Sequence, residues 1–246
     1  MHELLWITKL CNEYLAAPAN AVRSLLGAPA GDPSHPWTNY MAMELLVVVV
    51  LLAIPLLLRS MLSVDKPGGF QQVFELIYEF IDGMSHDIVG HDNRRYVPLF
   101  GTLFLFILIS NLIGLVPGNE SPTMFAPVPL GCAMITFLYY NYHGVRVQGP
   151  VNYLKHFAGP MWWLAWFIFP LEIASHFIRP ASLTIRLFAN MVAGEQVTIG
   201  FMRMVPALVP VIFMGLHVFV AFLQAFIFTV LTMAYVGGAV EHAEEH

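Results

Sequence analysis

The segment 41–58, MAMELLVVVVLLAIPLLL, most narrowly limits what this chain can fold into. It is almost wholly apolar and carries one charge, Glu44. A helix of this length spans the hydrocarbon core of a bilayer, which is about 30 Å thick. Pro55 lies near its end, and membrane helices tolerate such a proline. The segment therefore predicts a membrane-spanning helix.

The composition extends this prediction to the whole chain. Of 246 residues, 58% are hydrophobic and 11% are charged, whereas soluble domains carry roughly 25% charged residues. So few charges cannot cover the surface of soluble cores, and we predict an all-α integral membrane protein with about five membrane helices plus an amphipathic helix. The predicted membrane helices are 41–58, 97–117, 125–142, 161–201 and 205–236.

The amphipathic helix is predicted at 71–90, where apolar and acidic residues alternate at helical spacing. It is too polar to span a bilayer and is typical of an interfacial or bundle-packing helix. Its predicted apolar side consists of Phe74, Ile77, Tyr78, Ile81 and Met84.

The chain divides into a leading tail (1–40), a membrane domain (41–240) and a polar tail (241–246). The connections 59–96 and 143–160 hold six of the Lys and Arg residues, whereas the segments on the other side hold three. The side richer in Lys and Arg is normally cytoplasmic. We therefore expect the N-terminus outside and the C-terminus in the cytoplasm.

Arg186 lies in the apolar stretch ASLTIRLFAN. An arginine at mid-bilayer costs about 2.5–3.5 kcal/mol on insertion scales, so it persists only beside protein, water or a counter-charge. On a helix with about 100° between residues, several polar side chains fall within about 40° of it. The polar stripe predicted in this way consists of Glu172, Arg179, Ser182, Arg186 and Asn190.

Glu195 lies nine residues after Arg186, on the opposite face of the same helix, about 180° away. The last apolar segment has a polar stripe of its own, in which His217, Gln224 and Tyr235 share one face over about 27 Å. Two antiparallel helices with such stripes, joined by a turn near Pro206, would enclose a hydrated path.

These residue types suit proton transfer. Glu and His titrate and relay protons, and Asn, Gln, Ser and Tyr hold chains of water. Arg keeps its proton and serves instead as a fixed barrier or as the partner of a carboxylate. Since Arg186 has no acid close by on its own face of the helix, we expect its counter-charge on another chain.

Other classes of site have little support in the sequence. Glu172 and His176 are four residues apart, but no third ligand or zinc motif accompanies them, so we expect no metal and no cofactor. The net charge of −5 shows no basic block, so we expect no nucleic-acid partner.

The sequence from Arg186 to Met191 (RLFANM), then Ala193-Gly194-Glu195, His217 and Gln224 to Phe228 (QAFIF), closely resembles the a-subunit family of F-type ATP synthases. The resemblance is specific over roughly 172–235 and continues more weakly through NLIGLVPG at 111–118. Ala189 stands where the family has glycine, another small residue.

The resemblance implies a proton-channel stator subunit, not an enzyme by itself, in a bacterial inner membrane. Its partners would be the c-ring, whose carboxylate faces Arg186, and the b subunit of the peripheral stalk. Glu195 and His217 would belong to the extracytoplasmic half-channel, with Asn190, Gln224 and Ser182 near Arg186. Glu172 and Tyr235 would line the cytoplasmic half-channel. The last two helices would lie strongly tilted, as a membrane hairpin.

A stand-alone ion-coupled transporter is the alternative, because buried Glu, Arg and His suit it too. Such transporters usually contain internal repeats, and none is visible in this sequence. An intramembrane hydrolase is a third class, but the chain lacks a GxSxG or zinc motif.

Overall fold

The computed structural model describes residues 5–25, 35–63, 67–90, 93–116, 119–149, 165–204 and 208–240. Every regular element in these ranges is a helix, which confirms the all-α prediction. The elements are α1 (Trp6–Tyr14), α2 (Ala16–Leu25), α3 (Asn39–Met61), α4 (Gly69–Val89), η1 (Asn93–Arg95), α5 (Val97–Ile113), η2 (Pro122–Met124), α6 (Pro127–Gln148), α8 (Ala165–Met204) and α9 (Leu208–Val240).

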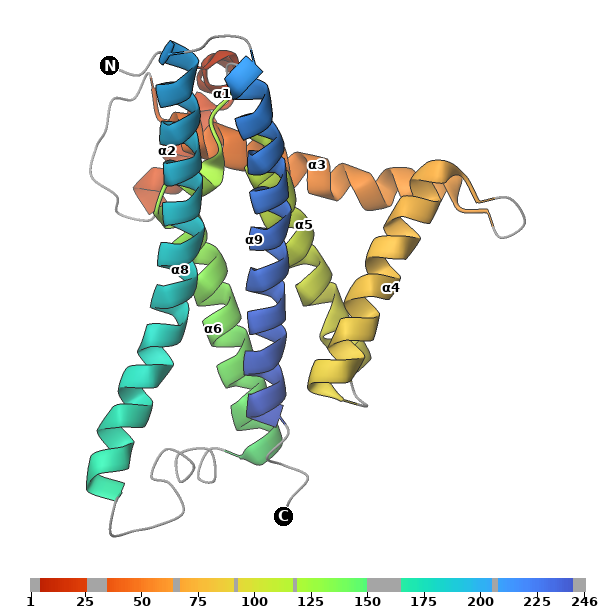
Figure 1. The fold of residues 1–246 in the computed structure, drawn as a ribbon, viewed down its shortest axis with the longest axis vertical. Helices are drawn as coiled ribbons and strands as arrows, with labels where there is room; N and C mark the ends of the chain where they lie inside the picture. The colour runs from red at the N-terminus through yellow and green to blue at the C-terminus, as the bar shows by residue number, and fades with distance from the viewer. Residues whose placement is uncertain are drawn as a thin grey trace.

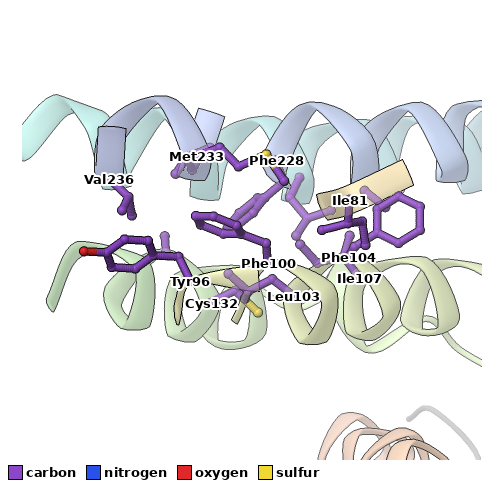
Figure 2. Packing of buried hydrophobic residues seen from close by; sticks show 14 of the residues in the cluster. Ile81, Tyr96, Phe100, Leu103, Phe104, Ile107, Cys132, Phe228, Met233 and Val236 are labelled. Atoms are coloured by element: carbon purple, nitrogen blue, oxygen red, sulfur yellow. The ribbon is translucent and has the colours of Figure 1, made fainter. Parts of the chain in front are cut away.

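Four helices, α5, α6, α8 and α9, run along the long axis of the molecule, and α3 runs across them (Figure 1). α9 contacts each of the other three. Between α9 and α5 lies a core in which Phe228 and Met233 point towards Phe100 and Phe104 (Figure 2). All four of these side chains are buried. This core fixes the helix that carries Gln224 and His217.

The amphipathic helix α4 packs on the bundle with one face. Ile81 is 1% exposed, and Ile77 and Met84 pack beside it against α5 and α9. Phe74 is half-buried, whereas Tyr78 is exposed and lies outside the packed face. Tyr78 sits about 100° from Ile77, at the edge of the predicted apolar side, so it turns outward.

The leading segment, predicted as a tail without assigned helices, contains the helices α1 and α2. α1 packs against the start of α3, where Thr8 Oγ1 donates to Oδ1 of Asn39 at 3.0 Å. Asn12 accepts the Trp37 backbone N–H at 2.9 Å and donates to the Trp37 carbonyl at 3.3 Å. These contacts hold part of the predicted tail 1–40 on α3.

α8 is the longest helix and continues through Pro170 and Pro180. At about 1.5 Å per residue, its 40 residues extend about 60 Å, twice the thickness of a hydrocarbon core. Its N-terminal part diverges from α9 (Figure 1), and a bend at proline is the physical cause expected for such divergence.

Two described helices are long and apolar enough to cross a membrane, at 39–60 and 212–240, and α5 is a shorter apolar helix. Most observed ends lie within four residues of the predicted ones, but α6 extends to Gln148, six residues past the predicted end, where Gly149 adopts φ 78°. The polar tail 241–246, residues 161–164 of the predicted helix and the turn at Pro206 lie outside the described residues.

Candidate functional site

The polar stripes of α8 and α9 meet along the contact between these antiparallel helices. Near the middle, Nδ2 of Asn190 donates to Oε1 of Gln224 at 2.7 Å. Gln224 is 2% exposed, whereas Asn190 is exposed at the helix surface. The bond therefore ties a buried amide of α9 to the edge of the α8 stripe.

His217 of α9 packs directly against the backbone of α8. A Cβ built on Gly194 would lie 3.1 Å from Nδ1 of His217 and 2.9 Å from Cε1, and the latter distance is closer than real Cβ contacts allow. Glycine at 194 therefore makes the space that the imidazole occupies. Glu195 is the next residue and is half-buried.

A cavity of about 250 Å³ opens beside this contact. Its polar wall is formed by Asn190 and Thr198 on α8 and His217 on α9, and its apolar wall includes Phe213, Leu216 and Val220. A space of this size holds several water molecules, and the three polar side chains supply hydrogen-bonding partners for them. The site can therefore hold water between the helices.

Glu172 and Tyr235 are linked through Arg179. Nη2 of Arg179 lies 3.6 Å from Oε1 of Glu172, and the guanidinium carbon lies 5.4 Å from the centre of the Tyr235 ring. The ion pair is about one third exposed on both sides, so it contributes at most about 1 kcal/mol to stability. It nevertheless places an acid and a tyrosine from two helices around one cation.

Arg186 lies between these two groups, one turn before Asn190 and two turns after Arg179. It is half-buried, as is Ser182 one turn earlier. Within the described part of the chain no carboxylate forms an ion pair with Arg186. Glu172 balances the charge of Arg179, whereas no carboxylate of the described residues balances that of Arg186.

His176 belongs to a cluster that sequence reasoning missed. Its Nε2 lies 2.7 Å from Oδ1 of Asn141 and 3.3 Å from the Tyr140 hydroxyl, both on α6. His176 is four residues after Glu172 on α8, and these hydrogen bonds cross from it to α6. Tyr140 and Asn141 lie within the run YYNY at 139–142, and their polar groups were the available signal.

A second buried polar network lies where α5 ends. Thr123 Oγ1 donates to Oδ1 of Asn111 at 2.6 Å, and Ser121 Oγ donates to the Ser110 carbonyl at 2.8 Å. Gly114 permits this contact, because a Cβ there would lie 2.7 Å from Cβ of Ser121. Asn111 and Gly114 belong to the NLIGLVPG stretch, so its polar and small residues serve packing against η2.

Known proteins resemble this chain along most of its length. The family model described as ATP synthase A chain matches residues 41–237. ATP synthase subunit a of Solibacter usitatus is 52% identical over 231 residues, covering 94% of this chain and 98% of the relative. That of Koribacter versatilis is 46% identical over 245 residues, covering 100% of both. That of Sulfurimonas denitrificans is 44% identical over 208 residues, covering 84% and 92%. With a family match over most of its residues and relatives aligned end to end, the chain belongs to the ATP synthase A chain family.

Proposed function

We propose that this chain is the proton-channel stator subunit of an F-type ATP synthase and performs no catalysis by itself. The observation that carries the proposal is Arg186, a half-buried cation in an apolar helix without a counter-ion among the described residues. A carboxylate that approaches from a partner would meet this unbalanced charge. We assign that carboxylate to the rotating c-ring.

The role of Arg186 follows from its charge. An ionised carboxylate is costly in lipid, so a c-ring carboxylate must be protonated before it leaves the protein surface. Arg186 favours the ionised form as the carboxylate passes, and the proton is released. Because Arg cannot itself relay a proton, it also blocks direct transfer between the two half-channels.

The extracytoplasmic half-channel is assigned to the cavity between α8 and α9. His217 and Asn190 lie on its wall, Gln224 bonds to Asn190, and Glu195 is adjacent to Gly194. These groups combine titratable side chains with water-holding amides, which suits proton delivery.

The cytoplasmic half-channel is assigned to the opposite end of the polar stripe. Glu172 and Tyr235 flank Arg179 there, and Ser182 lies between this group and Arg186. Glu172 is about 21 Å from Arg186 along the helix axis, at about 1.5 Å per residue. The two assigned paths therefore approach Arg186 from opposite directions along α8.

The membrane arrangement follows from helix length and direction. α3 matches the bilayer thickness, whereas α8 is about twice as long and runs across α3 (Figure 1). If α3 stands upright among about five membrane helices, α8 and α9 form a strongly tilted hairpin. Ile178 and Ile185 are 62% and 64% exposed beside the polar stripe, which suits an apolar helical partner such as the c-ring.

The membrane domain is assigned to 41–240, between the leading tail 1–40 and the polar tail 241–246. We place the chain in a bacterial inner membrane, with the N-terminus outside and the C-terminus in the cytoplasm. The excess of Lys and Arg in the connections 59–96 and 143–160 supports this orientation of the termini. The b subunit of the peripheral stalk is the second proposed protein partner.

The test is ATP-driven proton pumping by the assembled complex in inverted membrane vesicles. Arg186→Ala is expected to abolish acidification of the vesicles while the complex still assembles on native gels. Arg59→Ala is the control, because Arg59 is exposed at the end of α3. Pumping by the Arg186→Ala complex would contradict the proposal. Ion transport by the purified chain alone would favour the stand-alone transporter.

A further inference from the structure

An exposed apolar stripe on α6 leads to a cluster of cations. Ile135, Leu138 and Tyr142 are 54%, 61% and 59% exposed. At about 100° per residue, all three lie within about 80° of the direction of Arg146, which is exposed in the last turn of α6. From Ile135 to Arg146 the stripe extends about 16 Å along the helix.

A second arginine is held at the same end of α6. The ring of Tyr96 packs against His143 with centroids 5.0 Å apart and against Tyr139 at 6.2 Å. This aromatic contact fixes η1, and with it Arg95, beside the C-terminal end of α6. Arg95 and Arg146 both interact electrostatically with the buried His143.

The cations in this cluster are not balanced by the described part of the chain. Arg94, Arg95 and Arg146 are exposed, and no described carboxylate forms an ion pair with any of them. The cluster therefore presents positive charge next to an apolar surface. A ligand that satisfies both features must have an apolar body and an anionic end.

We propose that this face of α6 binds a phospholipid with an anionic headgroup. The acyl chain lies along Ile135, Leu138 and Tyr142, and the headgroup lies between Arg95 and Arg146. Basic groups between membrane helices on the cytoplasmic side suit anionic headgroups, and the planar guanidinium forms paired hydrogen bonds with phosphate. A soluble anion would match the arginines but leave the apolar stripe uncovered. The site is separate from Arg186 and does not depend on the assignment of the half-channels.

The proposal predicts a preference for headgroup charge, which photo-crosslinking measures. The purified complex is placed in phosphatidylcholine nanodiscs containing a trace of diazirine-acyl phosphatidylglycerol or, at the same fraction, diazirine-acyl phosphatidylcholine. Crosslinks are mapped to peptides of α6 by mass spectrometry. Phosphatidylglycerol is expected to label 135–147 at least about fivefold more than phosphatidylcholine, because each of the two arginines near the headgroup attracts anionic lipid by about that factor.

Variants locate the origin of the preference. Arg95→Gln/Arg146→Gln is expected to bring labelling by the two lipids to about the same level, whereas Arg146→Lys keeps the charge and most of the preference. Arg59→Gln removes an exposed arginine elsewhere and should leave the preference unchanged. Equal labelling of the unmodified complex by both lipids would overturn the proposal and would indicate a soluble anion or an acidic peptide at the arginines. A preference that survives in the double variant would overturn it as well.

Discussion

Asn190 and Gln224, 34 residues apart in sequence, share a hydrogen bond of 2.7 Å that joins α8 to α9. The contacts of His217 with Gly194 and of Tyr235 with Arg179 follow the same antiparallel alignment of the two helices. Three residues of the α9 stripe therefore face three positions of α8. This alignment places the cavity on one side of Arg186 and Glu172 on the other.

The effects of substituting Asn190 and Gln224 on stability should be coupled, because the two side chains share a hydrogen bond. Asn190→Leu leaves the buried Gln224 amide without this partner, at a cost of about 1–3 kcal/mol. Replacing both by Leu removes the unsatisfied group, so the double variant should be more stable than Asn190→Leu alone. The midpoint of thermal dissociation of the purified complex measures this. Additive losses in the double variant would show that the two amides act independently.

Gly194→Ala should disturb His217 while leaving α8 intact. The added methyl would lie 2.9 Å from the imidazole, so the ring must move out of its place beside the cavity. We expect ATP-driven proton pumping to fall about tenfold or more, as misplacement of a proton-transfer group does. Gly200→Ala is the matched control, because it brings the same gain in helix propensity and meets nothing within 4 Å. Equal pumping by the two variants would contradict the placement of His217.

Gly237→Val tests the approach of α4 to α9. A Cβ at Gly237 would lie 2.8 Å from the Ile88 carbonyl oxygen, a backbone atom that cannot rotate away. Overpacking of this kind costs about 1–3 kcal/mol. The neighbouring Gly238→Val adds its side chain where nothing lies within 4 Å. Thermal dissociation midpoints of the two variants should differ, with Gly237→Val the lower.

Cys11 lies outside the predicted membrane-spanning segments. Its thiol should be alkylated more slowly than an exposed thiol. Burial disfavours the thiolate and raises the pKa of Cys11 above its ordinary value of 9.0. Since the thiolate is the nucleophile, less than half of Cys11 is reactive at pH 9.0 and its alkylation rate still rises above that pH. Mass spectrometry of the α1 peptide follows this rate. A cysteine introduced by Glu13→Cys at an exposed site of α1 should reach about half its limiting alkylation rate at that pH, a larger fraction than Cys11.

Helix periodicity predicted which side chains share a face, because that depends only on residues within one helix. Arg186, Asn190 and Ser182 were placed in this way, and so were His217, Gln224 and Tyr235. Periodicity could not predict which residues contact each other across the two helices, because those contacts depend on how α8 is aligned along α9. Gly194 allows the close approach of His217, and no period in the sequence reveals that. His176 shows the same limit, since its hydrogen bond to Asn141 leads to α6.

Arg186 also bears on what happens before the complex forms. A newly inserted chain carries this cation with no counter-ion among its described residues, so its native state is incomplete alone. A partner that supplies a carboxylate binds only the folded form and stabilises it by mass action. Copies without a partner remain only marginally stable and are therefore degraded by proteases. The cellular amount of this chain should therefore follow the supply of the partner that brings the carboxylate, so that membranes do not accumulate unpaired copies.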